Sequence, residues 1–355
     1  MGSNLMKFQT KITVAMPVFN GERFLRPAIE SILNQSFSDF EFIIIDDGST
    51  DNSLAILREY EKVDSRIRVI SRENRNVAAT LNEIIELAKG EWIARMDQDD
   101  ISYPERFEVQ LDWIKNTGAD ICGSWARRFG ANDARVVRTL VSDADIKFQM
   151  MFQSPFIHPS VMMRSSFAKQ LRYNEINWQA EDYDFWFRAI KAGCVMANVP
   201  SILLGYRVHS SQISSKSILR QEEISKSVRR QYWSYYACRN FNIFLESDIE
   251  ILIKGSDGLL SMTELQVFNA ILEKLSALGT PGQRDAVINH ARICYYRNAS
   301  NINSITKEWI GFCRSTDSEL NILFLIKLMV IRVLRLNRSS RVYGYLRSFH
   351  IFLFK

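Results

Sequence analysis

The sequence predicts an α/β fold built on a mainly parallel sheet, followed by an all-helical C-terminal region. Strand-like and helix-like segments alternate along the first 100 residues. The strand-like segments are continuous apolar runs, which is typical of parallel strands buried on both faces. From about residue 218 onward only helical patterns remain. We therefore expect two domains, residues 1–215 and residues 216–355.

Four strands and three helices are expected in the first 100 residues. The strands are the apolar runs at residues 11–16, 40–46, 67–70 and 92–96. The helices lie between them, at residues 22–33, 52–60 and 76–88. Asp51 or Asn52 is expected to cap the second helix, and Gly90 follows the third. Pro17 is expected to end the first strand, because proline has no backbone N–H to donate.

The rest of the chain is mixed at first and then helical. Beyond residue 100 the sequence predicts helices at 104–116 and 182–192 and strands at 120–124, 160–163 and 203–208. The C-terminal helices are expected to break near Gly255, Gly258, Pro281 and Asn301.

Three of the first four strands run into polar segments, residues 17–20, 46–49 and 97–100. In a parallel sheet these ends lie along one edge, and ligands bind just beyond it. We therefore expect the three segments to converge into a single binding site.

Two acid clusters suggest the chemistry of that site. Asp97, Asp99 and Asp100 directly follow an apolar strand, where their like charges repel and desolvation adds to the cost. A bound cation would relieve this, and carboxylate oxygens suit Mg²⁺ or Mn²⁺. Acids at a helix N-terminus are the alternative, which explains one acid well and three poorly. The second cluster, Glu181 and Asp182, would supply a base, so the pattern indicates a metal-assisted transfer enzyme.

Composition excludes several other classes of protein. The hydrophobic fraction of 46% and charged fraction of 24% are ordinary for a globular protein. The 5 cysteines are scattered without a CxxC pair, so we expect neither a disulfide framework nor a zinc site. We expect no signal peptide, because the N-terminal segment leads into a strand pattern. Nothing in the composition predicts a nucleic-acid partner.

Several motifs in order resemble the family 2 glycosyltransferases, which have the GT-A fold and use nucleotide sugars. They are AMPVFNGE at residues 15–22, SILNQSF at 31–37, IDDGSTDNS at 45–53, GEWI at 90–93, DQDD at 97–100, PERF at 104–107, HPS at 158–160 and ED at 181–182. The resemblance covers roughly residues 10–210. In this family Asn76 often has a glycine counterpart, a departure that puts the expected uracil contacts from Asn76 to Asn82 in doubt.

The resemblance implies a donor site for a UDP-sugar. Its expected residues are Pro17, Phe19, Asn20, Asp47, Asn82, Asp97 and Arg207. Read without the family, residues 17–20 are a plain strand-to-helix turn, and residues 46–49 are a turn with a helix cap.

The resemblance also assigns the metal and the catalytic base. It places Mn²⁺ or Mg²⁺ on Asp99 and His209, with Asp100 in support, and makes Asp182 the base that deprotonates the acceptor hydroxyl. Glu181 and Trp186 would support the acceptor. Three alternatives stay open: a capping pair at Glu181 and Asp182, a core position for Trp186, and a structural role for His209.

The C-terminal segment is strongly basic. From Leu320 to Lys355 there are seven Lys or Arg and no Asp or Glu. At 100° per residue, Lys327, Arg332 and Arg335 spread over an arc of about 140°, opposite an apolar face. This pattern predicts an in-plane helix on an anionic membrane surface. A helix packed on its own domain, with a basic outer face, is the alternative.

Together these features predict an inverting, metal-dependent glycosyltransferase. By resemblance, it moves a sugar from a UDP-sugar to a lipid-diphosphate-linked acceptor and forms a β-linkage in bacterial O-antigen or capsule assembly. It would work at the cytoplasmic face of the inner membrane, or in the cytoplasm. A nucleotidyltransferase is the alternative enzyme, but it usually has a Gly-rich, basic loop after the first strand. A non-catalytic sugar-binding relative would be expected to lack Asp99 or Asp182.

Overall fold

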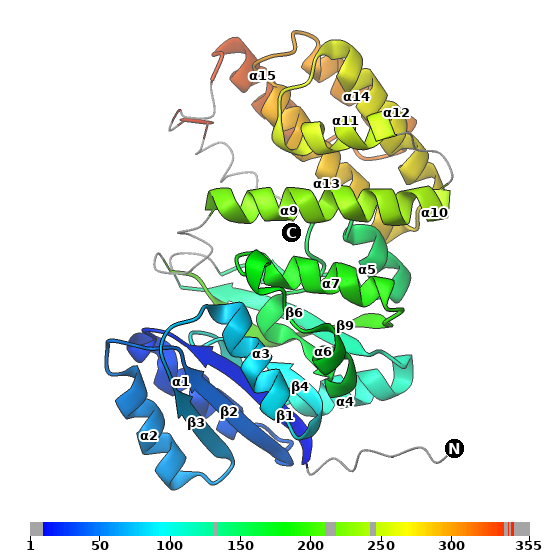
Figure 1. Cartoon of the computed structure of the whole chain (residues 1–355). Helices are drawn as coiled ribbons and strands as arrows, with labels where there is room; N and C mark the ends of the chain where they lie inside the picture. Colours follow the sequence, from blue (N-terminus) through cyan, green and yellow to red (C-terminus); the bar gives the residue numbers. More distant parts are fainter. Residues whose placement is uncertain are drawn as a thin grey trace, which may run out of the picture. The chain divides into compact units, whose positions relative to one another are not determined.

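A computed structural model describes residues 10–130, 134–209, 218–241, 246–336, 340 and 342–343 (Figure 1). The chain divides into two compact units, Met1–Val228 and Arg229–Lys355. The predicted boundary near residue 215 lies outside the described residues.

The first unit is built on a nine-stranded sheet with the order β3-β2-β1-β4-β8-β6-β9-β5, and β7 pairs with β6. The strands are β1 (Thr10–Val18), β2 (Phe40–Asp46), β3 (Ile67–Ser71), β4 (Gly90–Arg95), β5 (Ile101–Ser102), β6 (Ile121–Phe129), β7 (Val136–Val137), β8 (Met162–Arg164) and β9 (Met196–Arg207). Strands β1 to β4 pair in parallel, as do β6 and β9, while β8, β5 and β7 join antiparallel. The predicted mainly parallel sheet is confirmed.

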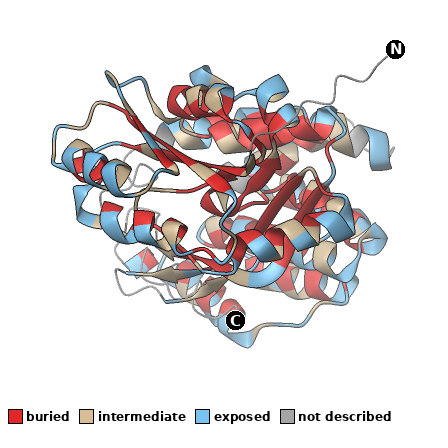
Figure 2. Cartoon of the chain, turned by 90° about the horizontal axis from the view of Figure 1, so that it is seen from below, coloured by how far each residue is buried: buried red, intermediate tan, exposed pale blue. Residues whose placement is uncertain are grey.

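Helices cover both faces of this sheet, which is why its strands are apolar throughout. On one face lie α1 (Glu22–Leu33), α2 (Ser53–Val63) and α4 (Arg106–Thr117), packed on alternate residues of β1 such as Val14 and Met16. On the other lie α3 (Val77–Leu87), α6 (Ser165–Leu171) and α7 (Glu181–Lys191), with α5 (Asp143–Gln149) packed beside β9. Figure 2 shows the buried residues concentrated along the strands.

Pro17 does not end the first strand, contrary to the sequence prediction. Strand β1 continues to Val18, and Pro17 lies in register with Ile45 of β2. Pairing between β1 and β4 stops at Ala15 and Arg95, so proline sits where the second ladder has already ended. The missing N–H therefore costs no ladder hydrogen bond.

Strand β9 is longer than the predicted strand at 203–208. It begins at Met196 and pairs with β6 through a bulge, where Val199 lies opposite Ser124 and Ile202 opposite Trp125. Pro200 falls among the residues left out of this pairing, so the proline that resembles a strand breaker is accommodated by the bulge.

In its described residues the second unit contains only helices, as predicted. They are the end of α9 (Ile218–Tyr232), a π-helical turn (Trp233–Ala237), α10 (Cys238–Phe241), α11 (Glu246–Asp257), α12 (Met262–Leu278), α13 (Pro281–Asn298), α14 (Ile305–Ser315) and α15 (Ile322–Val333). Capping boxes begin α12 and α13. The predicted break near Gly255 and Gly258 is confirmed, because α11 ends at Asp257, with Gly255 in its last turn. A Cβ there would meet the Phe268 ring at 2.5 Å, so glycine permits close packing of α11 and α12.

Candidate active site

Side chains join the ends of β1, β2 and β4 at one edge of the sheet. The backbone N–H of Asn20 donates to Ser49 Oγ at 2.9 Å, and Asn20 Oδ1 accepts from the Thr50 N–H at 2.8 Å. Gln98 donates from Nε2 to the Phe19 carbonyl at 3.0 Å, while its Oε1 accepts from the Phe19 N–H at 2.8 Å. The three polar segments therefore converge as predicted. The Phe19 side chain is 46% exposed at this edge.

Asp47 lies at the same edge, but its carboxylate already has partners in the protein. Oδ1 accepts from the Arg75 N–H at 3.0 Å and pairs with Arg72, and Oδ2 accepts from the Asn76 N–H at 3.1 Å. Asn76 adopts a φ of 90° and caps α3 by accepting from the Ala79 N–H. Asp47 thus shapes the loop between β3 and α3.

Asn82 is not brought to this edge. Its side chain is buried, and its Nδ2 donates to the Tyr173 carbonyl at 2.9 Å. Its Oδ1 accepts from the Tyr173 N–H at 2.7 Å. Both ends of the amide are therefore occupied in joining α3 to the segment after α6, and the structure gives no support to a uracil contact.

The first acid cluster is compact. One carboxylate oxygen from each of Asp97, Asp99 and Asp100 lies within 4.8 Å of the others. Asp99 Oδ2 lies 2.7 Å from His209 Nε2. Burial and the Asp97 charge raise the pKa of Asp99, although the bond to His209 acts in the opposite direction.

Asp100 links this cluster to the end of β9. Its Oδ1 accepts from the Arg207 N–H at 2.8 Å, and Arg207 Nε donates to the Asp99 carbonyl at 2.6 Å. The Arg207 guanidinium also lies 4.4 Å from the centroids of the Phe24 and Phe129 rings. Burial, followed by the charges of Asp97 and Asp99, holds the pKa of Asp100 well above its ordinary value.

The donor set of this cluster fits a hard divalent cation. Oδ2 of Asp100 is buried and has no hydrogen-bond partner among the residues that the structure describes. Such an orphaned carboxylate oxygen is costly unless a cation or a proton satisfies it. Asp97 and Asp99 offer further oxygens, and His209 adjoins them.

The second acid cluster begins α7. Ala180 is the N-cap residue, and backbone hydrogen bonds in the first turn favour the charged forms of Glu181 and Asp182, so the alternative of a capping pair stays open. Asp182 Oδ2 accepts from Ser154 Oγ at 3.1 Å. Burial raises the pKa of Asp182. Burial and the neighbouring Asp182 charge raise the pKa of Glu181 to about 8.

Arg95 lies between the two acid clusters, a site residue that the sequence motifs did not predict. It is 5% exposed and pairs with Asp97, which keeps its pKa above the ordinary value even though burial disfavours the charge. The positive charge of Arg95 also acts on Glu181 and Asp182, where it opposes the effect of burial on their pKa values without cancelling it. Arg106 of the PERF motif donates from Nη2 to the Arg95 carbonyl at 2.9 Å. An arginine ending an otherwise apolar strand was the available signal.

His158 lies beside Glu181, and Trp186 packs against His158. His158 Nε2 lies 2.8 Å from the Tyr173 hydroxyl and its Nδ1 lies 3.6 Å from Glu181. Trp186 is fully buried against Phe156, with ring centroids 4.9 Å apart, and meets His158 edge-on. The structure therefore supports the core position for Trp186 rather than sugar stacking.

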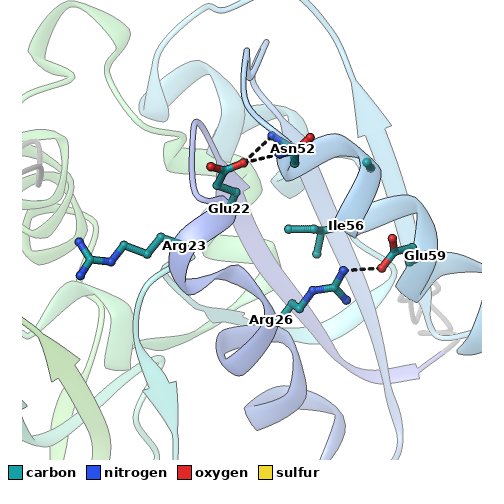
Figure 3. A pocket seen from close by; sticks show the side chains of 7 residues that line it. Glu22, Arg23, Arg26, Asn52, Ile56 and Glu59 are labelled. Atoms are coloured by element: carbon teal, nitrogen blue, oxygen red, sulfur yellow. Dashed lines mark hydrogen bonds and ion pairs between the residues drawn. The ribbon is translucent and has the colours of Figure 1, made fainter.

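A groove of about 640 Å³ lies between α1 and α2, outside this site (Figure 3). Three of its four charged side chains, Glu22, Arg26 and Glu59, have partners within the groove. Glu22 accepts from Asn52 and Arg26 pairs with Glu59 at 2.5 Å, while Arg23 points away from the other side chains. None of its lining residues belongs to the predicted site, so the groove adds no chemistry to it.

Comparison with known sequences finds one family model and several relatives. The model of Glycosyl transferase family 2 matches residues 13–191. An uncharacterized glycosyltransferase of Haemophilus influenzae is 30% identical over 278 residues, covering 74% of this chain and 84% of that relative. The O-antigen biosynthesis glycosyltransferase WbnJ of Escherichia coli is 29% identical over 247 residues, covering 68% and 97% of the two chains.

Solved structures share the fold. S. aureus TarS 1-349 in complex with UDP-GlcNAc has a TM-score of 0.54 at 16% identity, over 91% of this chain and 90% of that chain. The mannosyltransferase PcManGT of Pyrobaculum calidifontis, in complex with GDP-Man and Mn²⁺, has a TM-score of 0.50 at 13% identity, over 93% and 89%. These likenesses confirm the predicted GT-A fold.

Proposed function

The chain belongs to glycosyltransferase family 2, and from that premise we propose that it is an inverting, metal-dependent enzyme that uses a UDP-sugar. The observation that carries the proposal is the meeting of two acid clusters around Arg95 at the carboxyl edge of the parallel strands. A nucleotidyltransferase, the alternative enzyme, does not account for the family match.

Asp182 acts as the base in the proposed reaction. The acceptor hydroxyl gives its proton to this carboxylate while its oxygen attacks the anomeric carbon of the donor. The bond from that carbon to the diphosphate breaks, and UDP leaves with the bonding electrons. A single displacement on an α-linked donor yields a β-linked product. Burial raises the pKa of Asp182, which makes it a stronger base than an exposed aspartate.

The first cluster binds the donor in this proposal. Asp99, with Asp97 and Asp100, would hold Mn²⁺ or Mg²⁺, and His209 supports Asp99 from 2.7 Å. When bound, the cation would supply Lewis-acid stabilisation of the leaving diphosphate. Mn²⁺ in the complex of the similar PcManGT supports this assignment. Pro17, Phe19, Asn20 and Asp47 line the neighbouring edge for the nucleotide, and UDP-GlcNAc in TarS supports a uridine donor.

The acceptor that we propose is a sugar on a lipid diphosphate, in bacterial surface polysaccharide assembly at the cytoplasmic membrane face. The O-antigen role in the name of WbnJ supports this setting. Arg207 is proposed to offset donor phosphate charge, because it is anchored to the acid cluster by Asp99 and Asp100.

Asp182→Asn tests the proposal. The change keeps the shape of the side chain and removes the base, so transfer should fall about 10²- to 10⁴-fold while UDP binding stays nearly intact. Exposed Asp112 on α4 gives the matched control, Asp112→Asn, which should keep full transfer. NMR of the wild-type product reports its anomeric configuration. Transfer by Asp182→Asn within a few-fold of wild type, or a retained configuration, would contradict the mechanism.

A further inference from the structure

Helix α15 presents an apolar face outward. Its inward face packs through Phe324, Leu328 and Ile331, and the Phe324 ring lies 4.8 Å from Trp309 of α14. The apolar residues on the other side are between 45% and 77% exposed. They are Ile322, Leu323, Ile326, Met329 and Val333. At 100° per residue they fill an arc of about 120°, opposite the packed side.

This arrangement corrects the orientation expected from the sequence. Lys327 is only 7% exposed, so it does not belong to a basic outer face. A helix packed through an apolar face, with a basic face outside, was the alternative reading of the tail. The structure shows instead that both faces are apolar, and that the exposed basic side chains, Arg332 and Arg335, stand at the C-terminal end.

An exposed apolar face of this kind marks an interaction surface. Helix α15 has 12 residues and is about 18 Å long, well short of the roughly 30 Å of a bilayer core. Among the helices that the structure describes, none is long and apolar enough to span a membrane. On a membrane, this helix would therefore lie in the plane of the interface, with its apolar face toward the acyl chains.

The charge of the C-terminal segment, taken from the sequence, indicates which partner the face fits. The sequence from Leu320 to Lys355 carries seven Lys or Arg and no Asp or Glu. A second copy of the chain would bring the same positive side chains to the contact and no acid from this segment to pair with them. Anionic lipid headgroups supply the opposite charge directly above an apolar layer.

We infer that the outward face of α15 is a docking surface for an anionic lipid bilayer. Its apolar side chains enter the boundary between headgroups and acyl chains, and Arg332 and Arg335 meet the phosphates. A lipid-linked acceptor requires such a partner, and to that extent the inference deepens the proposed function. The test below uses neither donor nor acceptor, so the two can fail separately.

The test compares vesicle binding by the full chain and two triple variants. The test variant is Ile322→Gln, Ile326→Gln and Met329→Gln, which leaves every charge in place. The control carries the same kind of change at exposed apolar sites of other helices, Val267→Gln, Leu278→Gln and Ile293→Gln. Cosedimentation is measured with vesicles of phosphatidylglycerol and phosphatidylethanolamine, at low and at high salt, and with phosphatidylcholine vesicles for comparison.

Wild type and control should bind the anionic vesicles, and the test variant should bind at least about tenfold more weakly. Replacing Arg332 and Arg335 by Gln should weaken binding by about tenfold or more at low salt and by less at high salt. The single variant Met329→Gln, with circular dichroism of each protein, guards against a folding defect.

Three results would overturn the inference. Wild type does not bind anionic vesicles at low salt, or the test variant binds as well as wild type, or the control loses as much binding as the test variant. A test variant that changes only the oligomeric state, measured by light scattering, would assign the face to a second copy of the chain.

Discussion

Glu181→Gln should remove a large part of the pH dependence of stability. In the folded protein, burial and the neighbouring Asp182 raise the pKa of Glu181 from 4.5 to about 8. Above pH 4.5 the unfolded chain therefore loses a proton that the folded protein keeps. The contribution of Glu181 to the free energy of unfolding is fully present below pH 4.5. It falls as the pH rises toward 8 and is constant above that.

The size of this effect follows from the shift. The pKa of Glu181 rises by about 3.5, and each pKa unit corresponds to about 1.36 kcal/mol. The free energy of unfolding should therefore fall by about 5 kcal/mol between about pH 4.5 and pH 8. Gln has a similar shape and no proton to lose. The variant should match wild type at about pH 5 and exceed it by several kcal/mol at about pH 9.

Urea unfolding of wild type and Glu181→Gln across this range measures the difference. Exposed Glu86, replaced in Glu86→Gln, provides a control for the same chemical change at the surface. If the curves of wild type and Glu181→Gln run parallel, the buried carboxyl does not hold its proton. Glu181 would then carry a negative charge beside Asp182, and the raised pKa of Glu181 would be wrong.

Two further predictions concern the first acid cluster. Calorimetry of wild type with UDP should show binding that depends on Mn²⁺. Asp99→Ala should bind UDP weakly, and equally in Mn²⁺ and in EDTA. If wild type binds UDP with equal affinity in both conditions, no metal connects the protein to the diphosphate. Arg95→Met removes one partner of a buried ion pair, so in EDTA it should cost about 3 to 5 kcal/mol of unfolding free energy, with part of that loss restored by adding Asp97→Asn. A loss under about 1 kcal/mol would show that the Arg95 charge is not needed to hold the acids together.

The sheet could be predicted from the sequence because its signal is local. Each of β1 to β4 is an apolar run, and a parallel sheet places their ends together wherever the strands pair. The convergence of Asn20, Ser49 and Gln98 at one edge followed from that rule. It required no knowledge of which side chains would bond.

What failed depended on partners far away in the sequence. Pro17 is tolerated because the β4 ladder ends at Arg95. Asn82 is held by the backbone of Tyr173, 91 residues later. Lys327 is buried by packing that no helical periodicity reveals. For Pro17 and Lys327 a tertiary contact overrides what the local pattern indicates, whereas the role expected of Asn82 rests on the family resemblance and not on a local pattern.

The geometry of the first acid cluster gives the strongest reason for a cation in the proposed donor site. With Glu181 protonated near neutral pH, four carboxyl groups face three arginines. They are Asp97, Asp99, Asp100 and Asp182 on one side, and Arg95, Arg106 and Arg207 on the other. The raised pKa of Asp100 reduces this difference further, so the charges of the whole site come close to balance. Within the cluster, however, one carboxylate oxygen from each of three acids lies within 4.8 Å of the others, and Oδ2 of Asp100 has no hydrogen-bond partner among the described residues. In the proposed reaction a divalent cation held there would compensate the charge of the donor diphosphate, and Asp182 would stay available to receive the acceptor proton.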